Sequence, residues 1–156
     1  MNIDELARDY EAATNEFFAA LASVPPSRYD RHVEGGWSTR QVVHHVADSE
    51  AQSYARLRRL VAEPPGAVIQ GYDEALWALS PLLGYEELPL EHSLAVFSAV
   101  RQSSLDILRR LSPSDLERTG VHTESGPYSV RNWVDIYTRH PRDHAAQLLE
   151  AANSQD

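Results

Sequence analysis

Four stretches of the chain repeat apolar residues at spacings of three and four, the period of an amphipathic α-helix. They span about residues 3–22, 38–62, 90–111 and 129–151. Side chains at this spacing share one face of a helix, and that face must be buried against a neighbouring element. No stretch of similar length shows the alternation of a strand. We therefore predict an all-α fold, a four-helix bundle.

The ends of these stretches carry residues that start and stop helices. Asn2, Ser38 and Ser129 each precede a stretch and are good N-caps, because their side-chain oxygens accept backbone N–H groups of the first turn. The sequences SVPPSRYD and EPPG follow the first two stretches, and consecutive prolines cannot continue a helix. The helix boundaries are thus predicted by signals that are separate from the periodicity.

The connection between the second and third long helices, residues 64–90, is unusually long for a simple bundle. Its segment GYDEALWALS predicts a short helix capped by Asp73. Another connection, residues 118–128, is expected to be an extended loop or a small hairpin. We predict a single domain over residues 1–152, followed by a frayed tail at 153–156.

Composition excludes several classes of function. The net charge is −9 without an obvious basic stripe, which argues against nucleic acid as a partner. No apolar run approaches the roughly 18 residues of a membrane span. The acidic N-terminus lacks the order of a signal peptide, so we expect a cytoplasmic protein. Cysteine is absent, so any metal must be held by His, Asp or Glu, and thiol chemistry must use a thiol of the substrate.

The last helical stretch carries two histidines one turn apart, His140 and His144. Residues four apart are rotated by about 40° on a helix, so both imidazoles share the apolar face. The other members of that face are Trp133, Ile136, Tyr137, Gln147, Leu148 and Ala151. Each histidine can be a core residue bonded to a neighbour, but burial then requires two sets of hydrogen-bond partners. A shared metal ion would satisfy both, and we favour this interpretation.

A third ligand is expected on the second helix, where His44 and His45 are adjacent and point about 100° apart. His45 borders the apolar stripe and is the candidate that faces the bundle, whereas His44 is predicted to point to solvent. Asp48 is either an acceptor that orients one of the imidazoles or an exposed surface acid. Glu50 lies on the apolar face about 140° from His45, which favours an ion pair with an arginine over binding of the same metal.

Other side chains are candidates for the surroundings of the predicted site. Tyr137 precedes His140 by one turn and is, with Asp48, a candidate catalytic residue. Tyr137 and Trp133 are also typical of core positions, and the pattern favours that role over substrate contact. His122 either overhangs the site or is an ordinary loop residue.

Pro141 stands directly after His140 within the last helix. A proline in a helix interior removes one backbone hydrogen bond, here to the Tyr137 carbonyl, at a cost of about 3 kcal/mol. A kink or bulge at this point would free that carbonyl and reorient His140. The alternative is a harmless kink near the middle of the helix.

Several segments together resemble the DinB-like superfamily and, within it, the YfiT branch of bacillithiol transferases and metal-dependent hydrolases. These are WSTRQVVHHVADSE, GYDEALW, ERTGVHTESG and the closing His-x-x-x-His helix. The resemblance implies a homodimer of four-helix bundles with one divalent metal ion per chain, zinc or nickel. By position, the implied ligands are His45, His140 and His144. Pro141 and Asp143 depart from the family pattern, which leads us to expect small residues or histidine between the two ligands.

Three imidazoles with open coordination positions are typical of a catalytic metal site. The resemblance favours transfer of a low-molecular-weight thiol to an electrophilic substrate, with the metal activating the thiol. The first alternative is a hydrolase that activates water, for which Asp48 and, less well, Glu50 are the only general-base candidates on compatible faces. The second alternative is a metal-binding dimeric module without turnover.

Overall fold

The computed structural model describes residues 1–155, and most of these residues are helical. The long helices are α1 (Ile3–Ala22), α2 (Thr39–Ala62), α4 (Glu91–Leu108) and α5 (Val130–Asn153). The shorter elements are the helix α3 (Glu74–Leu79), the 3-10 helices η1 (Pro26–Arg28) and η2 (Pro113–Glu117), and the strands β1 (Ala67–Ile69), β2 (Thr119–His122) and β3 (Gly126–Ser129).

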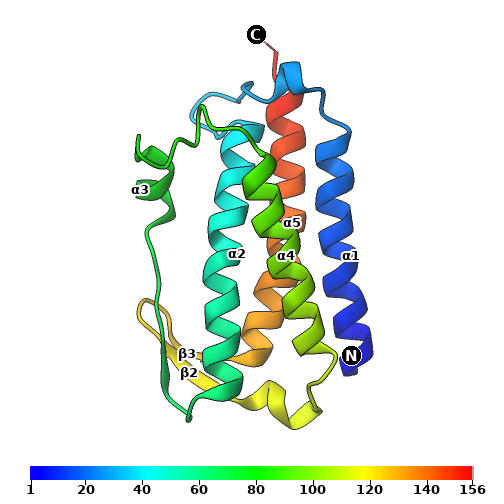
Figure 1. Cartoon of the computed structure of the whole chain (residues 1–156), viewed down its shortest axis with the longest axis vertical. Coiled ribbons are helices and arrows are strands. Elements are labelled where there is room, and N and C mark those ends of the chain that lie inside the picture. Colours follow the sequence, from blue (N-terminus) through cyan, green and yellow to red (C-terminus); the bar gives the residue numbers. More distant parts are fainter. Residues whose placement is uncertain (156) are drawn as a thin grey trace.

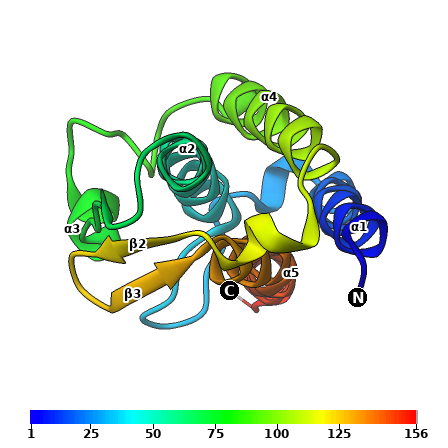
Figure 2. The same cartoon turned by 90° about the horizontal axis from the view of Figure 1, so that it is seen from below.

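The four long helices pack side by side as a bundle, as the periodicity predicts (Figure 1). Figure 2 shows them end-on: α1 lies beside α4 and α5, and α2 lies beside the same two helices on the opposite side. Consecutive helices α1 and α2 are therefore diagonal neighbours. This arrangement brings α2 and α5 into direct contact, and these are the two helices that carry the predicted metal ligands.

Helix starts follow the capping signals of the sequence. Asn2, Ser38 and Ser129 each form a capping box, in which the cap side chain and the residue three positions later exchange hydrogen bonds with backbone N–H groups. Asp73 caps α3 through the backbone N–H of Leu76, also as predicted. The α4 helix ends at Leu108, earlier than the periodic pattern.

A small three-stranded sheet accompanies the helical bundle. Of the two alternatives for residues 118–128, the hairpin is present: β2 and β3 pair antiparallel (Figure 2). The strand β1 pairs with β2 in parallel. Three residues are too few to show an alternating pattern, so β1 was not predictable from periodicity. A Cβ on Gly120 would lie 2.5 Å from the Ala67 carbonyl oxygen, so the close approach of β1 and β2 requires a glycine there.

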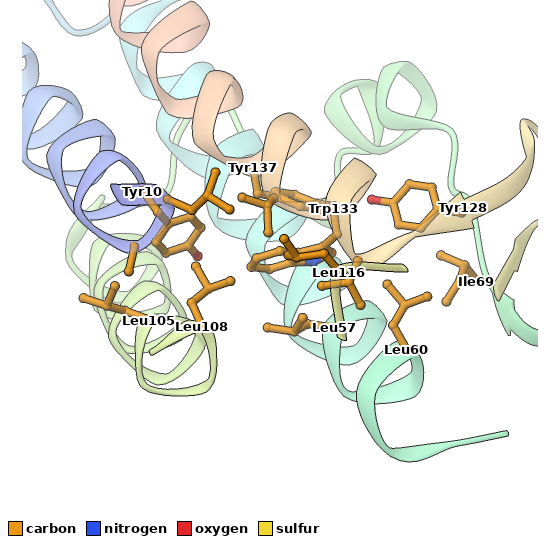
Figure 3. Close-up of a cluster of buried hydrophobic side chains, with 14 residues drawn as sticks. Tyr10, Leu57, Leu60, Ile69, Leu105, Leu108, Leu116, Tyr128, Trp133 and Tyr137 are labelled. Atoms are coloured by element: carbon orange, nitrogen blue, oxygen red, sulfur yellow. The ribbon is translucent and has the colours of Figure 1, made fainter. Parts of the chain in front are cut away.

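The core consists of two apolar clusters, one toward each end of the bundle. The cluster near the sheet, shown in Figure 3, includes Tyr10, Leu57, Ile69, Leu108, Trp133 and Tyr137. The other cluster includes Phe17, Val42, Val46, Phe97 and Leu148. Between them, each long helix contributes polar residues: Thr14 from α1, Glu50 from α2, Arg101 from α4 and His140 from α5. The candidate site lies at the level of this polar layer.

Candidate metal centre

Three imidazoles converge between α2 and α5. The Nε2 atom of His45 lies 3.3 Å from that of His140 and 3.1 Å from that of His144, and the last two are 3.0 Å apart. His45 is fully buried, and the other two are partly exposed. The i, i+4 spacing on α5 places His140 and His144 on one face, and the contact of α5 with α2 brings His45 against them.

Hydrogen bonding alone cannot account for this arrangement. A hydrogen bond between neutral imidazoles joins one nitrogen that carries a proton to one that does not. Three mutually adjacent nitrogens cannot all be paired in this way, so at least one contact joins two like atoms. Nitrogen ligands at about 2.0–2.1 Å from a tetrahedral zinc ion are about 3.3 Å apart, close to the observed separations. The residues therefore fit a divalent cation bound by three lone pairs.

The protonation states also suit a cation. Burial lowers the pKa of His45 to about 3 and lowers the pKa values of His140 and His144, so all three imidazoles are neutral at pH 7. With Nε2 free to ligate, the proton is on Nδ1. The Nδ1–H of His144 donates to Gln147 Oε1 at 2.7 Å, which fixes the orientation of that ring. Gln147 shares the predicted apolar face, so its position was visible in the sequence but its role was not.

Two predictions on α2 differ from the structure. His44 is buried rather than exposed: its Nε2–H donates to the Leu88 carbonyl at 3.0 Å, and its Nδ1 accepts from the Ser93 hydroxyl at 2.7 Å. Asp48, expected either to orient an imidazole or to be an exposed surface acid, is partly buried and accepts a hydrogen bond from the Tyr85 hydroxyl at 2.5 Å. Both differences arise because the connection between α2 and α4, together with the first turn of α4 at His44, packs over this side of α2.

A carboxylate that the sequence analysis missed lies beside the centre. Glu74 Oε2 is 3.6 Å from His45 Nε2, and the Glu74 side chain is 59% exposed. Glu74 is the first residue of α3 and follows the cap Asp73. Its sequence position has no helical relation to the histidines, so only the path of the connection brings it to this place.

An open pocket of about 440 Å³ adjoins the centre at His140. Residues from α2, the α2–α4 connection, the hairpin and α5 line it: Ser49, Arg56, Tyr72, Asp73, Glu74, Ala75, His122, Glu124, Ile136, Tyr137 and His140. Tyr137 and His122 thus lie beside the site. Trp133 does not: it is fully buried in the apolar cluster near the sheet, and its Nε1–H donates to the Ser53 carbonyl at 3.0 Å.

Behind the centre, Arg101 replaces the backbone hydrogen bond that Pro141 removes. The α5 helix continues through Pro141, and the Tyr137 carbonyl accepts a hydrogen bond from Arg101 Nη1 at 2.5 Å. The same nitrogen lies 3.0 Å from Glu50 Oε1, so Glu50 pairs with an arginine as predicted. The carbonyl that Pro141 frees, about one turn before His140, is thus held by a side chain from α4.

Comparison with known proteins places these features in a family. The family model described as the DinB superfamily matches residues 9–148. A protein of Oceanobacillus iheyensis, named "Putative metal-dependent hydrolase OB0782", is 41% identical over 122 residues, which are 78% of this chain and 69% of that protein. A protein of Bacillus mycoides with the same kind of name is 33% identical over 147 residues, 94% of this chain and 83% of that protein.

Two solved structures share the fold of this chain. YfiT from Bacillus subtilis, described as a probable metal-dependent hydrolase with an unusual four-helix bundle topology, superimposes with a TM-score of 0.83 at 27% identity. The match covers 96% of this chain and 85% of YfiT. TT2238, a four-helix bundle protein, shares the fold with a TM-score of 0.64 at 24% identity, over 94% of this chain and 97% of that one. The chain belongs to the DinB superfamily.

Proposed function

We propose that the protein is a divalent-metal-dependent enzyme that transfers a low-molecular-weight thiol to an electrophilic substrate. The convergence of His45, His140 and His144 is the observation that supports this proposal most directly. The names of the relatives, which refer to metal-dependent hydrolases, support metal dependence. For the metal we propose zinc or nickel, one ion per chain, because neutral imidazoles suit both ions.

When bound, the cation would supply Lewis-acid chemistry that lowers the pKa of a thiol or a water. The three imidazoles would hold it without adding charge, so the centre keeps a charge of +2, which favours an anionic sulfur. Glu74 Oε2, close to the centre and partly exposed, would accept the proton that the nucleophile releases. The pocket at His140 would hold the remainder of the substrate beside the centre.

Hydrolysis is the second candidate, and Glu74 is the observation that keeps it in consideration. In the sequence, Asp48 and Glu50 are the only general-base candidates, and the structure engages both elsewhere, with Tyr85 and Arg101. Glu74 would supply a base for water as well as for a thiol. A carboxylate at this place therefore removes one argument against a hydrolase without favouring water over sulfur.

The decisive experiment compares nucleophiles. Protein loaded with zinc or nickel is incubated with monochlorobimane and a panel of low-molecular-weight thiols, and in parallel with ester and amide substrates in water alone. We expect thiol-dependent product formation that is lost in His144→Ala and retained in His92→Ala, since His92 is an exposed residue at the start of α4. Hydrolysis without a thiol would instead support the second candidate. The absence of any turnover would leave a metal-binding module without catalysis.

Two further expectations belong to this proposal. We propose a homodimer, to be checked by sedimentation velocity, and a cytoplasmic location, to be checked by cell fractionation. Among the described residues, no helix has the length and apolar character needed to cross a bilayer.

A further inference from the structure

Arg56 is a charge without a counter-ion inside the candidate substrate pocket. It lies on α2, is partly buried and lines the pocket that adjoins His140. Within residues 1–155, no carboxylate oxygen lies within 4.0 Å of its guanidinium nitrogens. Partial burial of an uncompensated charge is unfavourable, and such a charge beside a pocket points to a ligand that compensates it.

The hydrogen bonds of Arg56 fix its position but leave donors unused. Its Nη1 donates to the Tyr137 hydroxyl at 3.0 Å, and its Nη2 donates to the Gln70 carbonyl at 2.8 Å. A guanidinium has five N–H donors, so donors remain after these two bonds and the contact with the Tyr128 hydroxyl. A fixed guanidinium with free donors is suited to a carboxylate, which it binds through two parallel hydrogen bonds.

The residues around Arg56 are neutral hydrogen-bonding groups. Burial raises the pKa of Tyr137 to about 12, so this phenol is protonated at pH 7. Burial and the nearby Arg56 charge lower the pKa of His122. The Nδ1 of His122 accepts from the backbone N–H groups of Glu124 and Ser125, so the proton of the neutral ring is on Nε2. None of these groups neutralises the guanidinium.

The acidic residues of the pocket lie in its exposed part. Asp73, Glu74 and Glu124 are all solvent-exposed, whereas Tyr137 and His122 are buried. The distribution therefore places negative charge toward solvent and positive charge toward the protein interior. Tyr137 links the two ends of the pocket, since its hydroxyl contacts Arg56 and its ring centroid lies 6.1 Å from that of His140.

We propose that Arg56 binds a carboxylate of the thiol substrate while the sulfur of the same molecule reaches the metal centre. This inference rests on the proposed thiol transfer and adds the chemical class of the thiol, a small carboxylate-bearing one. Arg56 selects among thiols by charge, and Tyr137 holds the guanidinium at a fixed place beside His140.

The test measures binding rather than turnover. Protein loaded with Co²⁺ is titrated with 3-mercaptopropionate, with the isosteric 3-mercaptopropionamide and with the cationic cysteamine, and the visible and near-ultraviolet spectrum reports sulfur coordination. We expect the carboxylate to bind about 10- to 100-fold more tightly than the amide, the range for a charge-assisted bidentate contact. In Arg56→Met this preference should vanish while the affinity for the amide stays within about threefold.

Two variants control for folding and general charge. Arg59→Met, three residues along α2 and exposed, removes the same charge outside the pocket and should keep the full preference. Arg56→Lys keeps the charge without the planar fork and should keep only part of the preference, which tests the inference even if Arg56→Met does not fold.

The outcomes separate the two proposals. Equal binding of the carboxylate and the amide by the unaltered protein, tighter binding of cysteamine, or an undiminished preference in Arg56→Met would overturn the role of Arg56 and leave thiol transfer standing. Failure of every thiol to change the spectrum of the unaltered protein would overturn thiol transfer itself, and the assignment of Arg56 with it.

Discussion

Two arginines contact Tyr137 from opposite sides, and only the one in the protein interior has a carboxylate partner within residues 1–155. On the interior side, Arg101 donates to the Tyr137 carbonyl and to Glu50, and both charged side chains are at most 1% exposed. On the pocket side, Arg56 donates to the Tyr137 hydroxyl but has no carboxylate partner within residues 1–155, and Glu74 is largely exposed. Charge that maintains the fold is compensated within the fold. Charge left uncompensated beside a pocket is available to a ligand.

The interior pair of Arg101 and Glu50 also stabilises α5 near Pro141. Because Pro141 has no N–H, the Tyr137 carbonyl, about one turn before His140, has no backbone hydrogen bond within the helix. Arg101 reaches that carbonyl from α4, bonds Tyr10 O and Thr14 Oγ1 on α1, and lies 3.4 Å over the Tyr10 ring. With Glu50 on α2, all four long helices are thereby joined directly behind the candidate metal centre.

The largest effect should come from removing the interior arginine. Arg101→Met leaves the Glu50 carboxylate buried without its partner, so we expect the free energy of unfolding to fall by about 3–5 kcal/mol. Urea denaturation followed by circular dichroism measures this. Arg56→Met should cost only about 1 kcal/mol, and the exposed Arg59→Met less than about 0.5 kcal/mol. Equal losses for Arg101→Met and Arg56→Met would break the comparison.

Substitution of the pocket acid Glu74 should affect activity, whereas substitution of the interior acid Glu50 should affect stability. Glu74→Gln is expected to lower turnover about 100-fold, because a general base contributes at least this much, while the free energy of unfolding stays within about 0.5 kcal/mol. Glu50→Gln should reduce stability instead, since Glu50 is fully buried against Arg101. Steady-state kinetics and urea denaturation of both variants check the contrast. A Glu74→Gln variant with full activity would contradict the assigned proton transfer.

The histidines of the centre make the stability of the metal-free protein depend on pH. Above about pH 6.5 the imidazole of His45 is neutral in both the folded and the unfolded chain, so it has no effect. Below that pH the unfolded chain takes up a proton that the folded chain, with a pKa of about 3 at His45, does not. Stability should therefore fall as the pH falls, by about 1.4 kcal/mol between pH 7.5 and 5.5 for this residue alone.

Urea denaturation at several pH values, with a chelator present, measures this dependence. His45→Gln should flatten the curve, whereas His92→Gln, at an exposed position, should leave it unchanged. Identical curves for the three proteins would show that the centre does not exclude protons.

The smallest expected effect concerns the hydrogen bond from Arg101 to the Tyr137 carbonyl, which replaces the backbone N–H that Pro141 lacks. Pro141→Ala restores an N–H to the Tyr137 carbonyl, so the loss caused by Arg101→Met should shrink by about 1 kcal/mol in that background. A double-mutant cycle of the four proteins, measured by urea denaturation, gives this coupling energy. A coupling of zero would mean that Arg101 does not compensate for Pro141.

Local signals predicted much of the fold and the three histidines that converge between α2 and α5. The caps Asn2, Ser38 and Ser129 and the apolar periodicity placed the long helices to within a few residues, because both act within one or two turns of chain. The pair His140 and His144 followed from helical spacing on one element. The addition of His45 required only the assumption that the apolar faces of the two helices meet.

The errors share a different origin. His44 was expected at the surface, and Asp48 either beside an imidazole or exposed at the surface. The connection between α2 and α4 instead covers His44 and supplies Tyr85 to Asp48. Glu74 was missed because its approach to His45 depends on the path of the same connection. A long connection has no periodic pattern that indicates which surface it covers.

By itself, the sequence determined which segments are helical, which faces are apolar and which helices carry imidazoles, since these depend on interactions between near neighbours in the chain. The tertiary structure decided which charges are compensated. Arg101 and Arg56 are both arginines on long helices, and one meets Glu50 in the interior while the other borders a pocket. Ion pairing depends on distances between side chains far apart in sequence, and these are fixed only when the helices and the connection pack together.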